Sequence, residues 1–214
     1  YGKDDNRVGY DAVIQAESGF MSMNGEPGGN SLKMPVALID LLAGHQLKEG
    51  ILVALYERQR SGIGCKVEVS LLDSALASLA NQATNHLMVG KTPTKQGSLH
   101  PNIAPYGEVV KTKDGSEILL ALGSDKQFQH LLKLLQLDAY LHDKRFVTNE
   151  KRVTNRKEMF DLLSNAFLLL NASDILPRLH ELKIPAGKIN TVAQALQLPQ
   201  ATPLILEKDG CKAV

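Results

Sequence analysis

The residue of this chain best suited to covalent chemistry is Asp40, which lies within the mostly apolar segment 35–44. A carboxylate among apolar residues is costly to bury unless it is paired, hydrogen-bonded or used. If a helix begins near Leu41, Asp40 would be its N-cap, where free backbone N–H groups and the helix dipole stabilise the anion. An ionised carboxylate of this kind could act as a nucleophile, and it could equally be a plain helix cap.

Two further segments, residues 9–19 and 97–106, combine polar side chains with glycine or proline. Their candidate site residues are Tyr10, Gln15 and Glu17 in the first segment, and His100, Asn102 and Tyr106 in the second. Such side chains could bind a polar substrate, but surface turns and ordered connections have the same composition. The residues alone leave both interpretations open.

Other kinds of site have little support. The chain has no Gly-x-Ser-x-Gly elbow, phosphate-binding glycine loop, dinucleotide fingerprint or His-Glu-x-x-His motif. His45 and Glu49 are four residues apart, which is more typical of a surface pair than of a metal site. No metal is therefore expected. A basic cluster at 151–157 predicts the solvated face of a helix.

The composition indicates a globular chain of one or two domains. Of its 214 residues, 43% are hydrophobic and 22% are charged, and the net charge of +1 favours neither nucleic acid nor an anionic membrane as a partner. Cys65 and Cys211 are too isolated to suggest a disulfide framework, which favours a reducing, cytoplasmic location. No apolar run reaches the ~20 residues of a membrane span.

The hydrophobic pattern predicts the elements that would position the candidate residues. Helices are expected over 41–60, 72–89, 124–135 and 149–170, with a shorter one after Ser173, and strands over 66–71, 106–112, 117–122 and 204–207. Residues 184–190 are expected to be an extended or turning segment. Ser124 with Gln127 forms a capping-box pattern, and Thr148 is the expected cap of the fourth helix. Residues 91–105 contain three prolines and predict an ordered loop or linker.

Taken together, several motifs resemble those of the class III CoA-transferases, the CaiB/BaiF type that includes formyl-CoA and carnitine CoA-transferases. They are Gly-Tyr-Asp at 9–11 with Gln-Ala-Glu-Ser-Gly at 15–19, Val-Ala-Leu-Ile-Asp-Leu-Leu-Ala-Gly at 36–44, Val-Glu-Val-Ser-Leu-Leu-Asp-Ser-Ala at 67–75, and His-Pro-Asn-Ile-Ala-Pro-Tyr at 100–106. The resemblance implies that Asp40 is the catalytic nucleophile and that Tyr10 is an active-site residue. Gln15 and Glu17 would lie near Tyr10, and the 100–106 segment would belong to a part of the small domain close to the site.

The fold implied by the resemblance is α/β, with a partial Rossmann-like large domain and a small α+β domain joined by linker helices. Residues 1–71 would be a remnant of the large CoA-binding domain and 99–168 the small domain. Residues 72–98 and 169–190 would be linkers, and 191–214 would begin the return to the large domain. Members of this family are about twice as long and form interlocked homodimers, so we expect a fragment that lacks the N-terminal half. The chain starts at Tyr1 and stops after an Asp209-Gly210 turn, so both ends look cut.

The reaction implied by the resemblance is the transfer of CoA from an acyl-CoA to a carboxylic acid, through mixed anhydrides and an aspartyl-CoA thioester. CoA enters as part of the substrate, and neither a metal nor ATP is needed. A related alternative is an α-methylacyl-CoA racemase, but the racemase histidine would fall at Tyr10, whose ordinary pKa near 10 suits a base poorly. A non-catalytic binding or assembly module of the same fold is a further alternative. The sequence does not identify the two acids.

Overall fold

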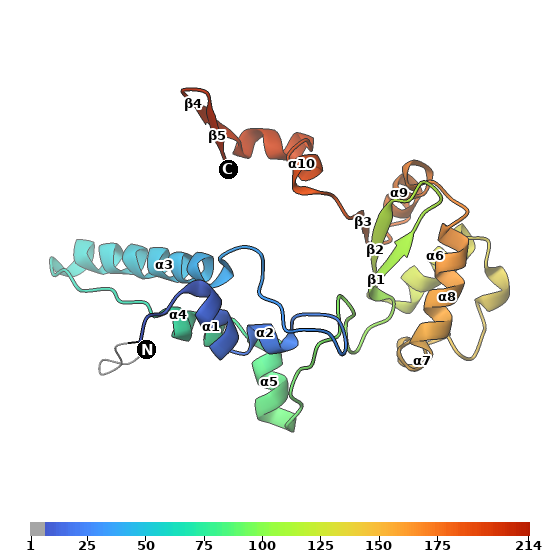
Figure 1. Cartoon of the computed structure of the whole chain (residues 1–214), viewed down its shortest axis with the longest axis horizontal. Helices are drawn as coiled ribbons and strands as arrows, with labels where there is room; N and C mark the ends of the chain where they lie inside the picture. Colours follow the sequence, from blue (N-terminus) through green and yellow to red (C-terminus); the bar gives the residue numbers. More distant parts are fainter. Residues whose placement is uncertain (1–6) are drawn as a thin grey trace. The chain divides into compact units, whose positions relative to one another are not determined.

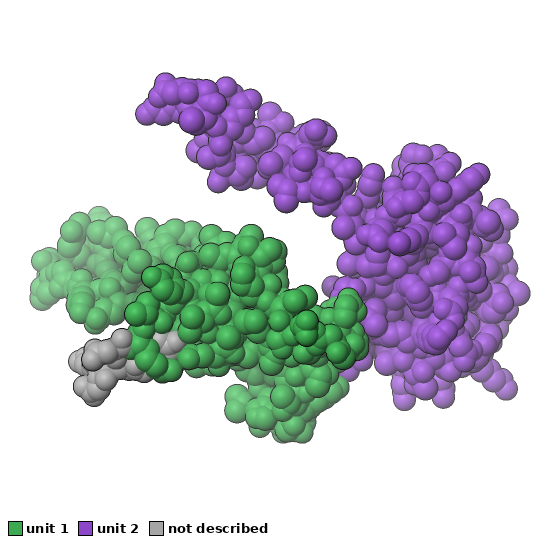
Figure 2. Space-filling view, viewed as in Figure 1, with its two compact units in different colours: residues 1–97 green, residues 98–214 purple. Residues whose placement is uncertain are grey.

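Both helices and strands are present in the computed structural model, which describes residues 7–214 (Figure 1). The chain divides into unit 1, which ends at Gly97, and unit 2, which runs from Ser98 to Val214 (Figure 2). The expected mixture of helices and strands is confirmed. Within the described part of the chain, all strands belong to unit 2.

Unit 1 consists of helices joined by irregular segments. The helices are α1 (Asp11–Glu17), α2 (Phe20–Met23), α3 (Leu38–Ser61), α4 (Leu71–Ala77) and α5 (Ala80–Val89). The buried apolar side chains of its core are Ile14 from α1, Ile39 from α3 and Ala75 from α4. These three residues therefore hold α1, α3 and α4 together.

Helix α3 confirms the predicted helix over 41–60 but begins three residues earlier. It ends as expected at Gly62, which adopts a φ of +75° and donates its N–H to the Arg58 carbonyl at 2.8 Å. Left-handed glycine is a common helix terminator because it has no Cβ to clash.

The strand expected over 66–71 is wrong. Residues 63–70 have no regular structure, and no strand of residues 7–214 pairs with them. A strand needs a partner for its backbone hydrogen bonds, so an alternating pattern alone is not sufficient. Val67 instead packs closely on α3, where a Cβ added at Gly50 would lie 2.7 Å from the Val67 Cγ1.

The single helix expected over 72–89 is divided into α4 and α5. Ser74 and Ser78 donate their hydroxyl groups to the carbonyls four residues earlier, at 2.8 and 2.7 Å, and Ala80 adopts a positive φ of 50°. Hydroxyl groups that compete for backbone carbonyls in this way weaken and bend helices. The predicted end at Gly90 is confirmed.

Unit 2 contains a three-stranded antiparallel sheet in the order β1-β2-β3. Its strands are β1 (Tyr106–Lys111), β2 (Glu117–Ala121) and β3 (Ala186–Lys188). Its helices are α6 (Asp125–Leu134), the 3-10 helix η1 (Asp138–Tyr140), α7 (Asn149–Thr154), α8 (Arg156–Phe167) and α9 (Ala172–Glu181). The hairpin predicted over 106–122 and the extended segment predicted over 184–190 are confirmed.

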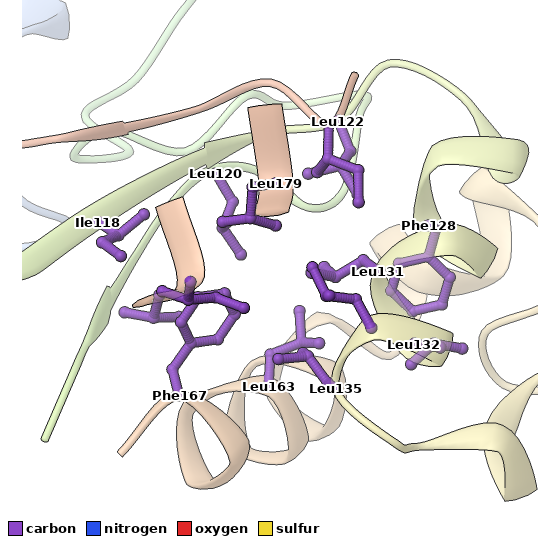
Figure 3. Packing of buried hydrophobic residues seen from close by; sticks show 14 of the residues in the cluster. Ile118, Leu120, Leu122, Phe128, Leu131, Leu132, Leu135, Leu163, Phe167 and Leu179 are labelled. Atoms are coloured by element: carbon purple, nitrogen blue, oxygen red, sulfur yellow. The ribbon is translucent and has the colours of Figure 1, made fainter. Parts of the chain in front are cut away.

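One face of this sheet packs on helices to form the main core. Ile118 and Leu120 of β2 belong to one cluster with Leu163 and Phe167 of α8 and with Leu179 of α9 (Figure 3). All five side chains are fully buried. Burial of each contributes about 1.5–3 kcal/mol, so this core fixes the strands that carry the 100–106 segment.

The predicted caps of α6 and α7 are largely confirmed. Ser124 accepts the N–H of Gln127 at 3.3 Å, and Thr148 accepts the N–H of Lys151 at 3.3 Å. The return bond of the capping box is different, since the Gln127 side chain accepts the N–H of Gly123 at 2.9 Å rather than that of Ser124.

The helix predicted over 149–170 is interrupted at Asn155. The Asn155 side-chain amide donates to the carbonyls of Lys151, at 2.9 Å, and Arg145, at 3.2 Å. A side chain that donates to a helical carbonyl in this way competes with the backbone N–H groups for that acceptor. The helix is therefore divided into α7 before Asn155 and α8 after it.

Residues 169–190, expected to be a linker, contribute α9 and β3 to unit 2, where Ile175, Leu179 and Ile184 belong to the core. The strand expected over 204–207 begins at Leu206, because Pro203 lies in a preceding 3-10 helix. The remaining elements are α10 (Val192–Ala195), η2 (Pro199–Leu204), β4 (Leu206–Lys208) and β5 (Cys211–Ala213). Strands β4 and β5 pair across the Asp209-Gly210 turn.

Within residues 7–214, no single helix has both the length and the hydropathy of a membrane span. Helices α8 and α9 meet the two criteria of length and hydropathy only when they are taken together, and the chain bends by 118° between them.

Candidate active site

Asp40 lies in the first turn of α3, one residue after the buried Ile39, and its own side chain is exposed. The prediction that Asp40 is the N-cap is wrong, because the helix begins at Leu38 and the N-cap is Ala37. A carboxylate in the first turn still lies at the positive end of the helix dipole. The side chain is therefore exposed at the positive end of the helix dipole, where it is available for chemistry.

The cap of α3 comes instead from α1. The Asp11 Oδ1 accepts the backbone N–H of Ile39 at 2.7 Å and, more weakly, the N–H of Asp40 at 3.4 Å. The Asp11 Oδ2 accepts a hydrogen bond from the Gln15 side-chain amide at 2.6 Å. In turn, the Gln15 Oε1 accepts the N–H of Met34 at 2.8 Å. This network fixes both the segment before α3 and the backbone at Asp40.

The other candidate residues of unit 1 differ in exposure. Gln15 is fully buried, and its amide oxygen and nitrogen both bind groups of this chain, which favours a positioning role over contact with a substrate. Tyr10 is 71% exposed and immediately precedes Asp11. Glu17 is exposed and forms an ion pair with Arg7 at 3.2 Å. Tyr10 and Asp40 are thus connected through a single residue, Asp11.

The candidate residues of unit 2 form one ordered loop. The N–H of His100 donates to the Tyr106 carbonyl at 2.9 Å, and the two rings meet edge to face with centroids 5.3 Å apart. The N–H of Asn102 donates to the His100 Nδ1 at 3.1 Å. His100, Asn102 and Tyr106 therefore lie together at one end of β1.

The basic cluster at 151–157 is not a uniform solvated face. Lys151 and Lys157 are exposed as predicted, but Arg152 is only 2% exposed and Arg156 is largely buried. Arg152 donates to the carbonyls of Ala104, at 2.7 Å, and Phe146, at 3.0 Å, and pairs with Asp125 at 2.7 Å. No pattern in the local sequence distinguishes the two arginines from the neighbouring lysines.

The two cysteines belong to none of the candidate clusters described above. Cys65 and Cys211 are both free and exposed. Among residues 7–214, no three His, Cys, Asp or Glu side chains are grouped as a metal site requires.

Removal of the Asp11 carboxylate should destabilise unit 1. We expect Asp11→Ala to lower the free energy of unfolding by about 1–3 kcal/mol, because three hydrogen bonds are lost and the Ile39 N–H is left without its acceptor. Asp11→Asn retains one oxygen and should cost less. Urea unfolding followed by circular dichroism at 222 nm measures both.

The matched control is Asp73→Ala, which removes an exposed carboxylate from the first turn of α4. It should leave the unfolding midpoint almost unchanged. Equal losses in Asp11→Ala and Asp73→Ala would contradict the capping role.

The sequence matches the family described as CoA-transferase family III over residues 1–206. This chain belongs to that family. The resemblance deduced from the motifs is thereby confirmed. As a family III CoA-transferase chain it carries Tyr10 and Asp40 in unit 1 and the 100–106 loop in unit 2.

Individual relatives are similar over most of this family III chain. A succinate–glutarate CoA-transferase from Agrobacterium fabrum is 41% identical over 193 residues, which are 90% of this chain and 48% of that protein. A human succinyl-CoA:glutarate CoA-transferase is 34% identical over 194 residues, which are 91% of this chain and 44% of that protein. The chain thus spans about half the length of these relatives.

A solved structure also shares this fold. The crystal structure of a CaiB/BaiF family protein from Brucella suis superposes with a TM-score of 0.85 at 37% sequence identity. The match covers 99% of this chain and 56% of that structure.

Proposed function

We propose that this chain is part of an enzyme that transfers CoA between carboxylic acids, with Asp40 as the nucleophile. The proposal depends on one observation above all: a family III chain places an exposed carboxylate in the first turn of a helix whose backbone is fixed by Asp11. A nucleophile needs both features, because it must reach the substrate and must be held in a reactive geometry.

In the proposed reaction, the Asp40 carboxylate attacks the donor thioester carbonyl and releases CoA thiolate, leaving a mixed anhydride. The thiolate then attacks the Asp40 carbonyl and releases the donor acid, which leaves an aspartyl-CoA thioester. The acceptor carboxylate attacks this thioester and again releases the thiolate. Attack of the thiolate on the acceptor carbonyl gives the new acyl-CoA and regenerates Asp40. Each step exchanges one activated acyl group for another, so ATP is not needed.

We propose short dicarboxylic acids as the substrates, because the two named relatives act on succinate and glutarate or their CoA esters. Tyr10 would donate a hydrogen bond near Asp40, and Glu17 would lie at the edge of the site. His100, Asn102 and Tyr106 would contact the acyl-CoA, whereas Gln15 would act through Asp11. Polar donors near a developing oxyanion lower the barrier of acyl transfer.

The exposed surface of α3 is an argument that the complete protein is a larger assembly. Its exposed apolar side chains are Leu41, Leu47, Ile51, Leu52, Val53, Leu55 and Tyr56. Seven exposed apolar side chains on one helix are typical of a surface that packs against another part of a protein. We propose that it packs against the rest of a Rossmann-like domain and a second subunit, in a cytoplasmic homodimer.

The test uses the complete protein with succinyl-CoA and isotopically labelled glutarate. We expect labelled glutaryl-CoA, ping-pong kinetics, and an Asp40 hydroxamate when hydroxylamine traps the thioester. With a chiral α-methylacyl-CoA, incorporation of solvent deuterium next to the thioester, with no need for an acceptor acid, would instead indicate racemisation. Absence of both turnover and label would indicate a non-catalytic module.

A further inference from the structure

Glu108 is an unusual residue for the core of unit 2. It lies on β1 opposite Leu120 and is only 1% exposed. Among the groups that the structure describes, neither carboxylate oxygen has a hydrogen-bond partner of normal geometry. Burial raises the pKa of Glu108, and the nearby Arg156 guanidinium offsets this only in part. The ionised side chain therefore destabilises the fold relative to a neutral one.

Arg156 connects this carboxylate to the 100–106 loop. Its Nη1 lies 3.5 Å from the Glu108 Oε1, and its Nη2 donates to the carbonyl of His100 at 2.7 Å and to that of Ile103. A planar guanidinium can serve a carboxylate and two carbonyls at once, which a single ammonium group cannot match in geometry. Arg156 thus bridges the sheet and two points of the loop backbone.

Two neighbouring side chains hold the rest of the same loop. Asn149 accepts the N–H of Ala104 at 3.1 Å and donates to the Asn102 carbonyl at 2.8 Å. Arg152 donates to the Ala104 carbonyl at 2.7 Å. The backbone from residue 100 to residue 104 is therefore fixed by α7 and the start of α8. Only Arg156, however, is tied to a buried charge on the sheet.

We propose that Arg156, oriented by Glu108, is a positioning residue that sets the 100–106 loop and, through it, the His100 and Tyr106 rings. The inference rests on the proposed function, because that function assigns the two rings to the acyl-CoA site. Glu108 explains the arrangement: its charge holds one edge of the guanidinium and leaves the other edge for the two carbonyls. A buried carboxylate that reduces stability is retained here because it orients this arginine.

The first test measures hydrogen exchange in this chain, which requires no catalysis. We expect Arg156→Gln and Glu108→Gln to speed exchange of the loop amides at His100 and Ala104 by about tenfold, equivalent to one lost hydrogen bond. The amides of β2 should be unchanged. The matched control is Lys157→Gln, which removes an adjacent exposed charge paired with Asp161 and should not alter the loop.

Stability separates a positioning role from a structural one. Glu108→Gln keeps the side-chain volume and removes the buried charge, so its thermal midpoint at pH 7 should equal or exceed that of the wild type. Faster loop exchange without loss of stability is therefore the expected result. Unchanged loop exchange in Arg156→Gln, or a change equal to that in Lys157→Gln, would overturn the inference.

The second test measures kinetics in the complete protein. Arg156→Lys keeps the charge but loses the planar geometry, and we expect about a tenfold loss in kcat/KM for acyl-CoA with little change in the acceptor KM. If the loop responds but the wild type transfers no CoA, the positioning role stands and the proposed function fails. If the wild type transfers CoA and Arg156→Lys is fully active, the proposed function stands and the inference fails.

Discussion

Replacement of Asp40 by Ala or Asn in the complete protein should reduce CoA transfer by at least about 10³-fold. The loss is large because no other group can form the covalent intermediate once the carboxylate is removed. The fold should be preserved, since the side chain is exposed and the Asp40 backbone is held by Asp11. Asp40→Asn removes the charge and keeps the shape of the side chain. Asp40→Ala is needed as well, because asparagine can deamidate back to aspartate whereas alanine cannot.

The measurement is steady-state transfer from succinyl-CoA to glutarate, together with trapping by hydroxylamine. The matched control is Glu49→Gln, which removes an exposed carboxylate from the same helix and should retain nearly full activity. Turnover of Asp40→Ala within tenfold of the wild type would contradict the assignment of the nucleophile. A hydroxamate on any other carboxylate would do the same.

Substitution of Gly107 by Ala should lower the free energy of unfolding by about 3 kcal/mol or more. Gly107 adopts a φ of +95°, and a Cβ there would lie 1.8 Å from the Ser98 carbonyl oxygen. The site is closed further by the Ser98 hydroxyl, which donates to the Gly107 carbonyl at 2.6 Å. Backbone movement is the only relief, and it would displace the start of β1, where the strand pairing with β2 is already irregular.

Differential scanning calorimetry should show this as a fall in the unfolding midpoint on the order of 10 °C. Gly115→Ala is the matched control, because Gly115 has a similar φ of +77° but no atom within 4 Å of its added Cβ. The Gly115→Ala substitution should therefore cost only the strain of placing alanine at a positive φ, about 1 kcal/mol. Equal effects of the two substitutions would show that the contact with Ser98 has no energetic consequence.

Local patterns were sufficient to predict much of unit 2. The hairpin around residues 113–116 was predictable because alternating apolar positions flank an Asp-Gly turn, and both determinants are contained in one short segment. The caps at Ser124 and Thr148 were predictable for the same reason. The breaks at Ala80 and Asn155 were missed, since each depends on side chains that compete for backbone groups.

The candidate site was less predictable because its supports come from distant parts of the chain. Asp40 was expected to be a cap, but Asp11, 29 residues away, supplies that function. Arg152 and Arg156 resemble the neighbouring lysines in charge, yet they bind carbonyls about 50 residues away. Nothing in the local sequence records such contacts. The sequence and the family resemblance indicated Asp40, Tyr10 and Gln15 as candidates, whereas the contacts of Asp11, Arg152 and Arg156 became apparent only in the structure.

The cap that Asp11 supplies has a consequence for protein engineering. Most helices carry their own capping residue and can be moved as single segments, but α3 borrows its cap from another helix. A graft of residues 38–61 into a new scaffold would transfer Asp40 without the anchor of its backbone. The smallest transplantable unit must also include residues 10–15 and the connection at Met34, because Gln15 couples the two.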